Sequence, residues 1–229
     1  ARFPNEPARK IELARSLGNA AVQAQQAGAP DKAASLDRSA LDLLASLPPA
    51  SIDPDAIYLS AMTGNHLAEL VEVRDGLKSA EPIYQKALAD FRNLVALPGA
   101  RPEFVRQIIE VLLEYGFRQI RADAVEKARG AWTEALAAIR SPAGTDMADE
   151  IADLATKLAI NLAGIAQLDH QQARFDKAHE MLALARDLRR DRLVSSPTVG
   201  QGALALARLE LLEGAWREER NNKKEAIEA

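Results

Sequence analysis

Hydrophobic residues recur at intervals of three and four along most of the chain, as they do on one face of an α-helix. Ile83, Ala87, Leu88, Phe91 and Leu94 show this spacing within one segment. No segment alternates hydrophobic and polar residues between turn signals, as a half-buried strand would. The pattern therefore predicts an all-α fold without a β-sheet.

Prolines mark where several of the expected helices end. A proline cannot continue the hydrogen-bond ladder of a helix, and it is common just beyond the last turn. Each of four helical segments is followed by proline: residues 31–47, 77–97, 124–139 and 174–193 precede Pro48, Pro98, Pro142 and Pro197. We expect these segments to be the second helices of four helical hairpins.

Capping residues mark the first helices. Asp53 before Pro54 is a favoured N-cap followed by proline in the first turn, and Thr145 and Thr198 are further candidate caps. One first helix is expected to start at Pro54, and the others to cover residues 8–26, 104–120, 146–168 and 199–219. The pattern thus predicts nine helices and the start of a tenth.

A motif of the form Ala-x3-Φ-x2-Ala, where Φ is usually bulky, repeats in the second helices. It occurs as Ala33/Asp37/Ala40, Ala80/Tyr84/Ala87, Ala128/Trp132/Ala135 and Ala178/Leu182/Ala185. The first alanines stand 47, 48 and 50 residues apart, and Ala226 follows at a similar distance. This spacing predicts one helical-repeat domain with approximate repeats 5–49, 50–99, 100–143, 144–197 and a partial repeat 198–229.

The small residues of this motif have a physical reason. Alanines at i and i+7 lie on one stripe of a helix and let neighbouring backbones approach closely, while the bulky residue at i+4 fills the space beside them. Trp132 occupies the bulky position and is expected to be buried in the core. Asp37 makes the first repeat the weakest match to the motif.

These residues resemble the signature of the tetratricopeptide repeat (TPR) family. That family carries Leu-Gly-x2-Tyr in its first helix and Ala-x3-Phe-x2-Ala in its second. The first-helix half is clearest at Leu17-Gly18, with weaker matches at Gly64, Gly116 and Ala163. The resemblance implies a right-handed α-solenoid of antiparallel helix pairs, whose first helices line a concave groove that binds a peptide or protein.

The repeat length departs from the usual TPR pattern. TPR units span about 34 residues and HEAT units about 40–47, so a HEAT-like stack stays open as an alternative. The long spacing also resembles the repeats attached to serine/threonine kinases of planctomycete-type bacteria, on residues 97–103 and from Ala128 onward. No glycine-rich phosphate loop, His-Arg-Asp or Asp-Phe-Gly motif occurs, so a kinase domain would lie outside this chain.

Composition narrows the functional classes. Of the 229 residues 48% are hydrophobic, and the formal net charge of −4, with both signs spread along the chain, is unlike the basic footprint of a nucleic-acid-binding protein. The absence of cysteine excludes disulfides, thiolate zinc sites and cysteine nucleophiles. No stretch reaches 18 uninterrupted hydrophobic residues, so no membrane span is expected. The first ten residues show no signal-peptide pattern, and we expect a segment of a longer protein.

No cluster of side chains indicates catalysis, a metal site or a cofactor. The three histidines, His66, His170 and His179, form no i, i+4 pair and are interpreted as surface or packing residues. Acidic residues near one helix start are favoured by the helix dipole, namely Asp146, Asp149, Glu150 and Asp153. A set of arginines is expected to be a solvated face because Asp187 and Asp191 interleave with it: Arg186, Arg189, Arg190 and Arg192.

Candidate binding residues lie on the first helices. Arg15-x3-Asn19 resembles the Lys-x3-Asn with which some TPR proteins hold a C-terminal carboxylate, through ion pairing and amide hydrogen bonds. Asn65 falls at a similar place in the second repeat, whereas the third repeat offers Phe117. The complete predicted groove comprises Arg15, Asn19, Gln23, Asn65, Glu69, Phe117 and Arg121.

The sequence therefore predicts a passive protein–protein interaction scaffold without catalysis, whose partner is a protein or a peptide. Two alternatives stay open. One is a homo-oligomerisation or structural module, and the other is a sensor or regulatory region of a larger kinase. The sequence indicates no cellular compartment.

Overall fold

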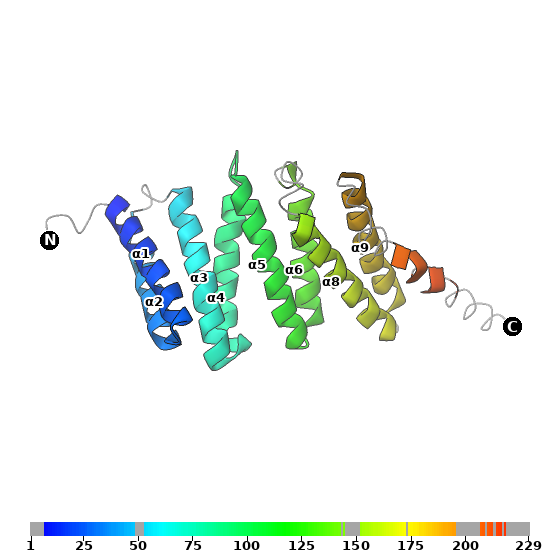
Figure 1. Ribbon diagram of the computed structural model, residues 1–229, viewed down its shortest axis with the longest axis horizontal. Coiled ribbons are helices and arrows are strands. Elements are labelled where there is room, and N and C mark those ends of the chain that lie inside the picture. The colour runs from blue at the N-terminus through cyan, green and yellow to red at the C-terminus, as the bar shows by residue number, and fades with distance from the viewer. Residues whose placement is uncertain are drawn as a thin grey trace. The chain divides into compact units, whose positions relative to one another are not determined.

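The described part of the chain is built of α-helices (Figure 1). The computed structural model describes residues 7–48, 53–142, 144, 152–172 and 174–195, together with 207–208, 210–212, 214–216 and 218. No strand occurs among these residues, so the predicted all-α fold is confirmed for them. None of the described helices is long and apolar enough to cross a membrane. Two compact units are distinguished, Ala1–Val111 and Leu112–Ala229.

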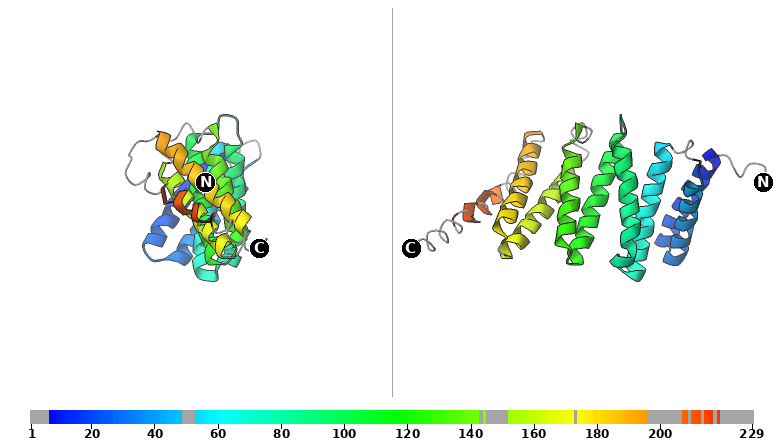
Figure 2. Two further views of the ribbon diagram at one scale, coloured as in Figure 1. Left: turned by 90° about the vertical axis from the view of Figure 1, so that its right-hand side faces the viewer. Right: turned by 180° about the vertical axis from the view of Figure 1, so that it is seen from behind.

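The first unit contains two helical hairpins. The first hairpin pairs α1 (Pro7–Gln26) with α2 (Pro30–Ala45), and the second pairs α3 (Pro54–Asp75) with α4 (Leu77–Val95). The two hairpins join because α2 packs against α3. Seen from behind in Figure 2, α2 (blue) and α4 (turquoise) face the viewer. The next helix, α5 (Pro102–Arg121), begins in this unit.

The second unit contains the end of α5 and three further described helices. These are α6 (Val125–Ile139), α8 (Ala152–Gln171) and α9 (Phe175–Ser195). Helices α8 and α9 pack closely as a hairpin, and α6 packs against α8. Trp132 of α6 donates a hydrogen bond from Nε1 to the carbonyl of Leu113 in α5 at 3.2 Å, which joins these two helices as well.

The helix ends follow the proline and capping signals of the sequence. Helices α2, α4 and α6 each end three residues before a proline, at Pro48, Pro98 and Pro142. Asp53 caps α3, since its side chain accepts a hydrogen bond from the backbone N–H of Ala56 at 2.8 Å. Thr145 and Thr198 lie outside the described residues, and the helix expected at 199–219 is described only in the positions given above.

Helices α1 and α5 are each followed by a residue in the left-handed backbone conformation. Gly28 has φ 76°, and the N–H of Ala29 bonds to the carbonyl of Ala24 at 2.9 Å. Asp123 has φ 59°, and the N–H of Ala124 bonds to the carbonyl of Gln119 at 2.8 Å. This six-to-one bond with a left-handed residue defines the Schellman motif. Asp123 is tolerated there because a short polar side chain adopts this conformation more readily than most.

Small residues bring the helices together, as the motif predicted. The alanines of the four second-helix motifs are at most 1% exposed: Ala33, Ala40, Ala80, Ala87, Ala128, Ala135, Ala178 and Ala185. The bulky residues between them, Tyr84, Trp132 and Leu182, are also buried, which confirms the expectation for Trp132. The predicted stripe of alanines therefore lies at helix interfaces in both units.

The first helices carry a matching small position that differs from the sequence expectation. Ala21, Ala68, Gly116 and Ala166 each stand twelve residues before the first alanine of the following second helix, and all four are buried. The sequence comparison had matched Gly18, Gly64, Gly116 and Ala163, so only Gly116 falls on this position. The common spacing of twelve residues defines this position, while Gly64 is also buried and a Cβ added to it would meet Ala87 of α4 at 3.4 Å.

Substitution of Gly116 would test the close approach of α5 to α6. A Cβ added to Gly116 would overlap the indole ring of Trp132, whereas a Cβ added to Gly130 of α6 meets nothing within 4 Å. We expect Gly116→Ala to destabilise the protein by about 1–3 kcal/mol through overpacking. Gly130→Ala should stabilise it by about 0.5–1 kcal/mol, because alanine is the better helix former. Urea unfolding of the two variants measures both effects, and equal signs would contradict this packing.

Ala135 provides a second test in the same unit. Replacing this fully buried alanine by leucine adds volume at a helix interface, and we expect a cost of about 1–3 kcal/mol. Arg190→Ala is the control, because Arg190 is exposed and its ion pair with Glu210 at 2.7 Å is a surface pair. That change should stay within about 0.5 kcal/mol. A neutral Ala135→Leu in urea melts would show that the alanine stripe has been assigned to the wrong face.

Candidate peptide-binding surface

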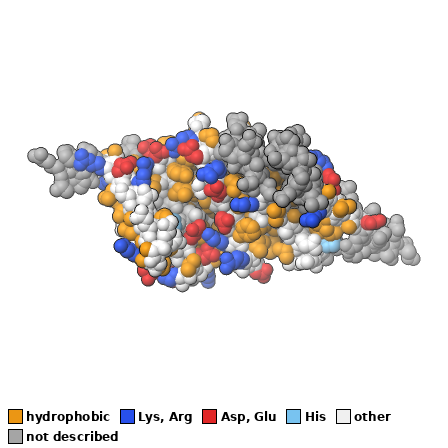
Figure 3. Space-filling view, viewed as in Figure 1, with side chains coloured by type: hydrophobic (Ala, Val, Ile, Leu, Met, Phe, Trp, Pro, Cys, Tyr) orange, Lys and Arg blue, Asp and Glu red, His pale blue; other side chains and the backbone are white. Residues whose placement is uncertain are grey.

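The first helices carry rows of outward-facing side chains. On α1 the row consists of Arg15, Asn19, Val22 and Gln26, which follow helical spacing and are all exposed. The positions 47 residues later on α3 are Met62, His66, Glu69 and Val73, of which Val73 is 87% exposed and the others are partly buried. Helix α1 contacts α3, and the two rows place both polar and hydrophobic side chains on the surface of the first unit. Figure 3 shows charged side chains of both signs set among hydrophobic ones.

Five predicted groove residues belong to this first unit. Arg15 is half exposed and pairs with Glu12 at 3.3 Å, and Asn19 and Gln23 are exposed. Asn65 donates a hydrogen bond from Nδ2 to Oε1 of Glu69 at 3.2 Å. Asn65 and Gln23 lie beside the two rows, whereas Arg15, Asn19 and Glu69 lie on them. The structure thus brings these residues to one pair of helices.

The remaining two predicted residues belong to the second unit. Phe117 is 43% exposed and packs edge-on against Trp132, with 5.6 Å between the ring centroids. Arg121 is exposed at the end of α5. Phe117 therefore combines a supporting contact to the core with a hydrophobic surface that a partner could cover.

A buried polar cluster supports the rows on α1 and α3. Asp37 of α2 is fully buried, and its Oδ2 lies 2.7 Å from Nδ1 of His66. The other ring nitrogen, Nε2, lies 2.9 Å from Oε1 of Gln25 on α1. Because both ring nitrogens face oxygen atoms, the geometry suits the doubly protonated imidazolium, in which both are donors. His66 thus joins α1, α2 and α3 through one side chain.

The electrostatics favour the charged form of this histidine. The hydrogen bond to Asp37 raises the pKa of His66 above its ordinary value, and the negative charges of Asp37 and Glu69 act in the same direction, against partial burial. The sequence interpretation of His66 as a packing histidine holds, but its buried partner was missed. The signal that could have found it is Asp37, a carboxylate where the motif normally has a bulky hydrophobic residue.

The second unit has its own buried carboxylate. Asp169 of α8 is fully buried and lies between two guanidinium groups, 2.6 Å from Arg129 and 2.8 Å from Arg174. Nearby, Glu126 is bonded to Lys177 at 3.1 Å, and this contact lowers the pKa of Glu126. These pairs tie α6 to α8 and to the first turn of α9, and join α8 to Arg174 in the turn between α8 and α9, so they connect the helices of the second unit.

The other side chains considered in the sequence have ordinary partners where they are described. His170 stacks on Trp216 with 4.3 Å between ring centroids, and Trp216 is buried. Arg186 pairs with Asp187, in keeping with a solvated charged face. Some positions have no described side chain, namely Asp146, Asp149, Glu150, Asp153, Arg189 and Arg192. Among the described residues no group of three His, Asp or Glu side chains could hold a metal ion.

Comparison with known proteins supports the fold. No protein-family model matches the chain, and no curated protein sequence matches it. Among solved structures, BtubC (BKLC) from P. vanneervenii is similar, with a TM-score of 0.51 and 20% sequence identity over 96% of this chain and 84% of that one. At this level of identity the likeness concerns the helical fold alone.

The cluster around His66 predicts a pH-dependent stability. The pKa of His66 is raised in the folded state, so its stabilising contribution is complete below the unfolded value of about 6.5 and is lost as pH rises through the folded value. We therefore expect the free energy of unfolding to fall as the pH rises from about 6.5 into the alkaline range, and expect His66→Asn to remove most of this fall. Urea melts across this range measure it.

His179→Asn serves as the control for this measurement. His179 lies in the second unit, with its ring 6.1 Å from that of Trp216, and has no part in the Asp37 cluster. Its replacement should leave the fall in stability with rising pH largely in place. A fall that survives His66→Asn unchanged would show that another group controls it.

Proposed function

We propose that the protein is a TPR-like helical-repeat scaffold that binds a peptide or protein segment on its first helices and performs no catalysis. The observation that carries the proposal is the pair of rows on α1 and α3, in which Arg15, Asn19 and Glu69 stand beside hydrophobic side chains, backed by tightly packed alanines. Close packing holds these helices in place before a partner arrives, which lowers the entropic cost of binding.

The spacing of the helices supports the proposed repeat architecture. First helices α1, α3 and α5 start at Pro7, Pro54 and Pro102, which are 47 and 48 residues apart. Each contains a buried small residue, and the alanine stripe of the following second helix begins twelve residues after it. We infer a right-handed solenoid with repeats of about 48 residues, closer to TPR than to HEAT units in its Ala-x3-Φ-x2-Ala motif.

The first unit offers complementary groups for an extended peptide. Arg15 supplies a cation, and its present partner Glu12 is an exposed carboxylate that a peptide carboxylate can displace at little cost. Asn19 and Gln23 supply amides for the peptide backbone, and Asn65, held by Glu69, extends the polar surface onto α3. These groups are suited to holding a C-terminal carboxylate with the residues before it.

Self-association is the second candidate function. Leu13 on α1 and Val73 on α3 are exposed by 52% and 87%, and hydrophobic side chains of this kind also suit contacts between copies. Light scattering at several protein concentrations separates the two functions, because a peptide-binding monomer keeps its mass.

Display of random peptides with free C-termini tests the proposal. We expect selected peptides to bind in fluorescence anisotropy, and the Arg15→Ala/Asn19→Ala variant to bind them at least roughly tenfold more weakly, as loss of a charge-assisted contact predicts. Lys32→Ala on α2 is the control, since Lys32 is an exposed cation away from the first helices. Failure to select any peptide, or equal losses in both variants, would exclude binding at this surface.

A further inference from the structure

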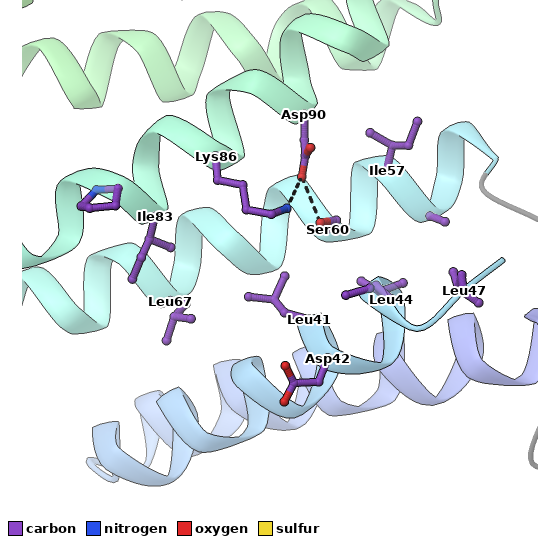
Figure 4. Close-up of a pocket in the computed structure, with 13 residues that line it drawn as sticks. Leu41, Asp42, Leu44, Leu47, Ile57, Ser60, Leu67, Ile83, Lys86 and Asp90 are labelled. Atoms are coloured by element: carbon purple, nitrogen blue, oxygen red, sulfur yellow. Dashed lines mark hydrogen bonds and ion pairs between the residues drawn. The ribbon is translucent and has the colours of Figure 1, made fainter. Parts of the chain in front are cut away.

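A hydrophobic groove lies on the second-helix side of the first unit. Its two walls are α2 and α4, its floor is α3, and its volume is about 520 Å³ (Figure 4). The hydrophobic lining comes from all three helices and includes Leu41, Leu44, Leu47, Ile57, Leu67 and Ile83. A volume of this size falls within the range of about 300–1,000 Å³ that is usual for ligand-binding clefts.

The few polar groups of the groove are unevenly placed. On the α4 wall, Asp90 accepts hydrogen bonds from Lys86 at 3.1 Å and from Ser60 at 3.0 Å (Figure 4). On the α2 wall, Asp42 is exposed, and no described side chain pairs with it. The charged lining residues are thus two carboxylates and one lysine, which leaves an unmatched negative charge at Asp42.

This groove is distinct from the polar rows of the first helices. Successive helix residues are turned by about 100°, so Leu67 and Glu69 point about 200° apart around α3. Leu67 lies in the groove together with Ile57 and Ser60, whereas Glu69 lies on the outward row with Met62 and Val73. The two surfaces therefore occupy opposite faces of α3.

We propose that the groove docks an amphipathic helix of a partner protein, with its hydrophobic face toward Leu41, Leu67 and Ile83 and a lysine or arginine beside Asp42. A helix satisfies its own backbone hydrogen bonds, and the hydrophobic walls offer almost no groups that could satisfy those of an extended peptide. Two walls and a floor made of helices match the helix-in-groove mode, in which residues at i, i+3, i+4 and i+7 anchor the partner. The unmatched charge of Asp42 selects a basic residue over an acidic one.

Isoleucine methyl NMR locates the bound helix. The probe is a synthetic 18-residue amphipathic peptide with leucine on one face and lysine on the other, and a peptide of scrambled order is the comparison. The methyl signals of Ile57 and Ile83 should shift on titration, while that of Ile160, an isoleucine 58% exposed on α8, should not. Shifts at Ile160 as large as those in the groove, binding of the scrambled peptide with equal affinity, or no binding would overturn the proposal.

Two variants test the recognition. Ile83→Ser should weaken the binding of the lysine peptide at least tenfold, with circular dichroism showing an intact fold, whereas Val73→Ser on the opposite face should leave it unchanged. A second variant tests the charge. The unmodified protein should prefer the lysine peptide over a peptide with glutamate in place of each lysine, and Asp42→Lys should reverse this preference. An unchanged preference would exclude Asp42 as the selecting charge. The Arg15→Ala/Asn19→Ala variant should retain this binding, which keeps the test independent of the function proposed for the first helices.

Discussion

The fold depends on the close approach of helix backbones through small side chains. In each motif two fully or almost fully buried alanines, such as Ala128 and Ala135, follow a buried small residue of the first helix, such as Gly116, at a fixed spacing. Interiors of this density tolerate little change in volume. Trp132 illustrates the constraint, because its indole occupies the space that a side chain at Gly116 would need.

Two buried carboxylates of the described residues are held by basic partners. Asp37 takes the place of a bulky hydrophobic residue and is compensated by His66, and Asp169 is compensated by Arg129 and Arg174. A buried carboxylate without such partners would be costly. In the first unit the Asp37–His66 pair is expected to make the stability of the contact among α1, α2 and α3 depend on pH. In the second unit the partners of the buried carboxylate are arginines rather than a histidine.

The two proposed binding surfaces use the same helix in different ways. The outward face of α3 carries His66 and Glu69 beside Met62 and Val73 and joins α1, which suits recognition of a peptide by both polar and hydrophobic contacts. The opposite face is hydrophobic and forms the floor between α2 and α4, which suits burial of a helix. A repeat helix that packs against neighbours on two sides still leaves these two faces open. The fold likeness to BtubC (BKLC) agrees with the helical architecture and does not distinguish between the surfaces.

Hydrophobic periodicity, proline and capping signals determined the helices, because these properties depend on residues a few positions apart. The sequence also predicted the buried alanine stripe and Trp132, since they repeat at a fixed interval. The register of the first helices was different: Gly18 and Gly64 matched the family motif, but Ala21 and Ala68 occupy the position equivalent to Gly116. The pairing of Asp37 with His66, 29 residues apart, and the groove between α2 and α4 also required the tertiary structure. Such contacts depend on how separate helices pack, and no local pattern encodes which faces meet.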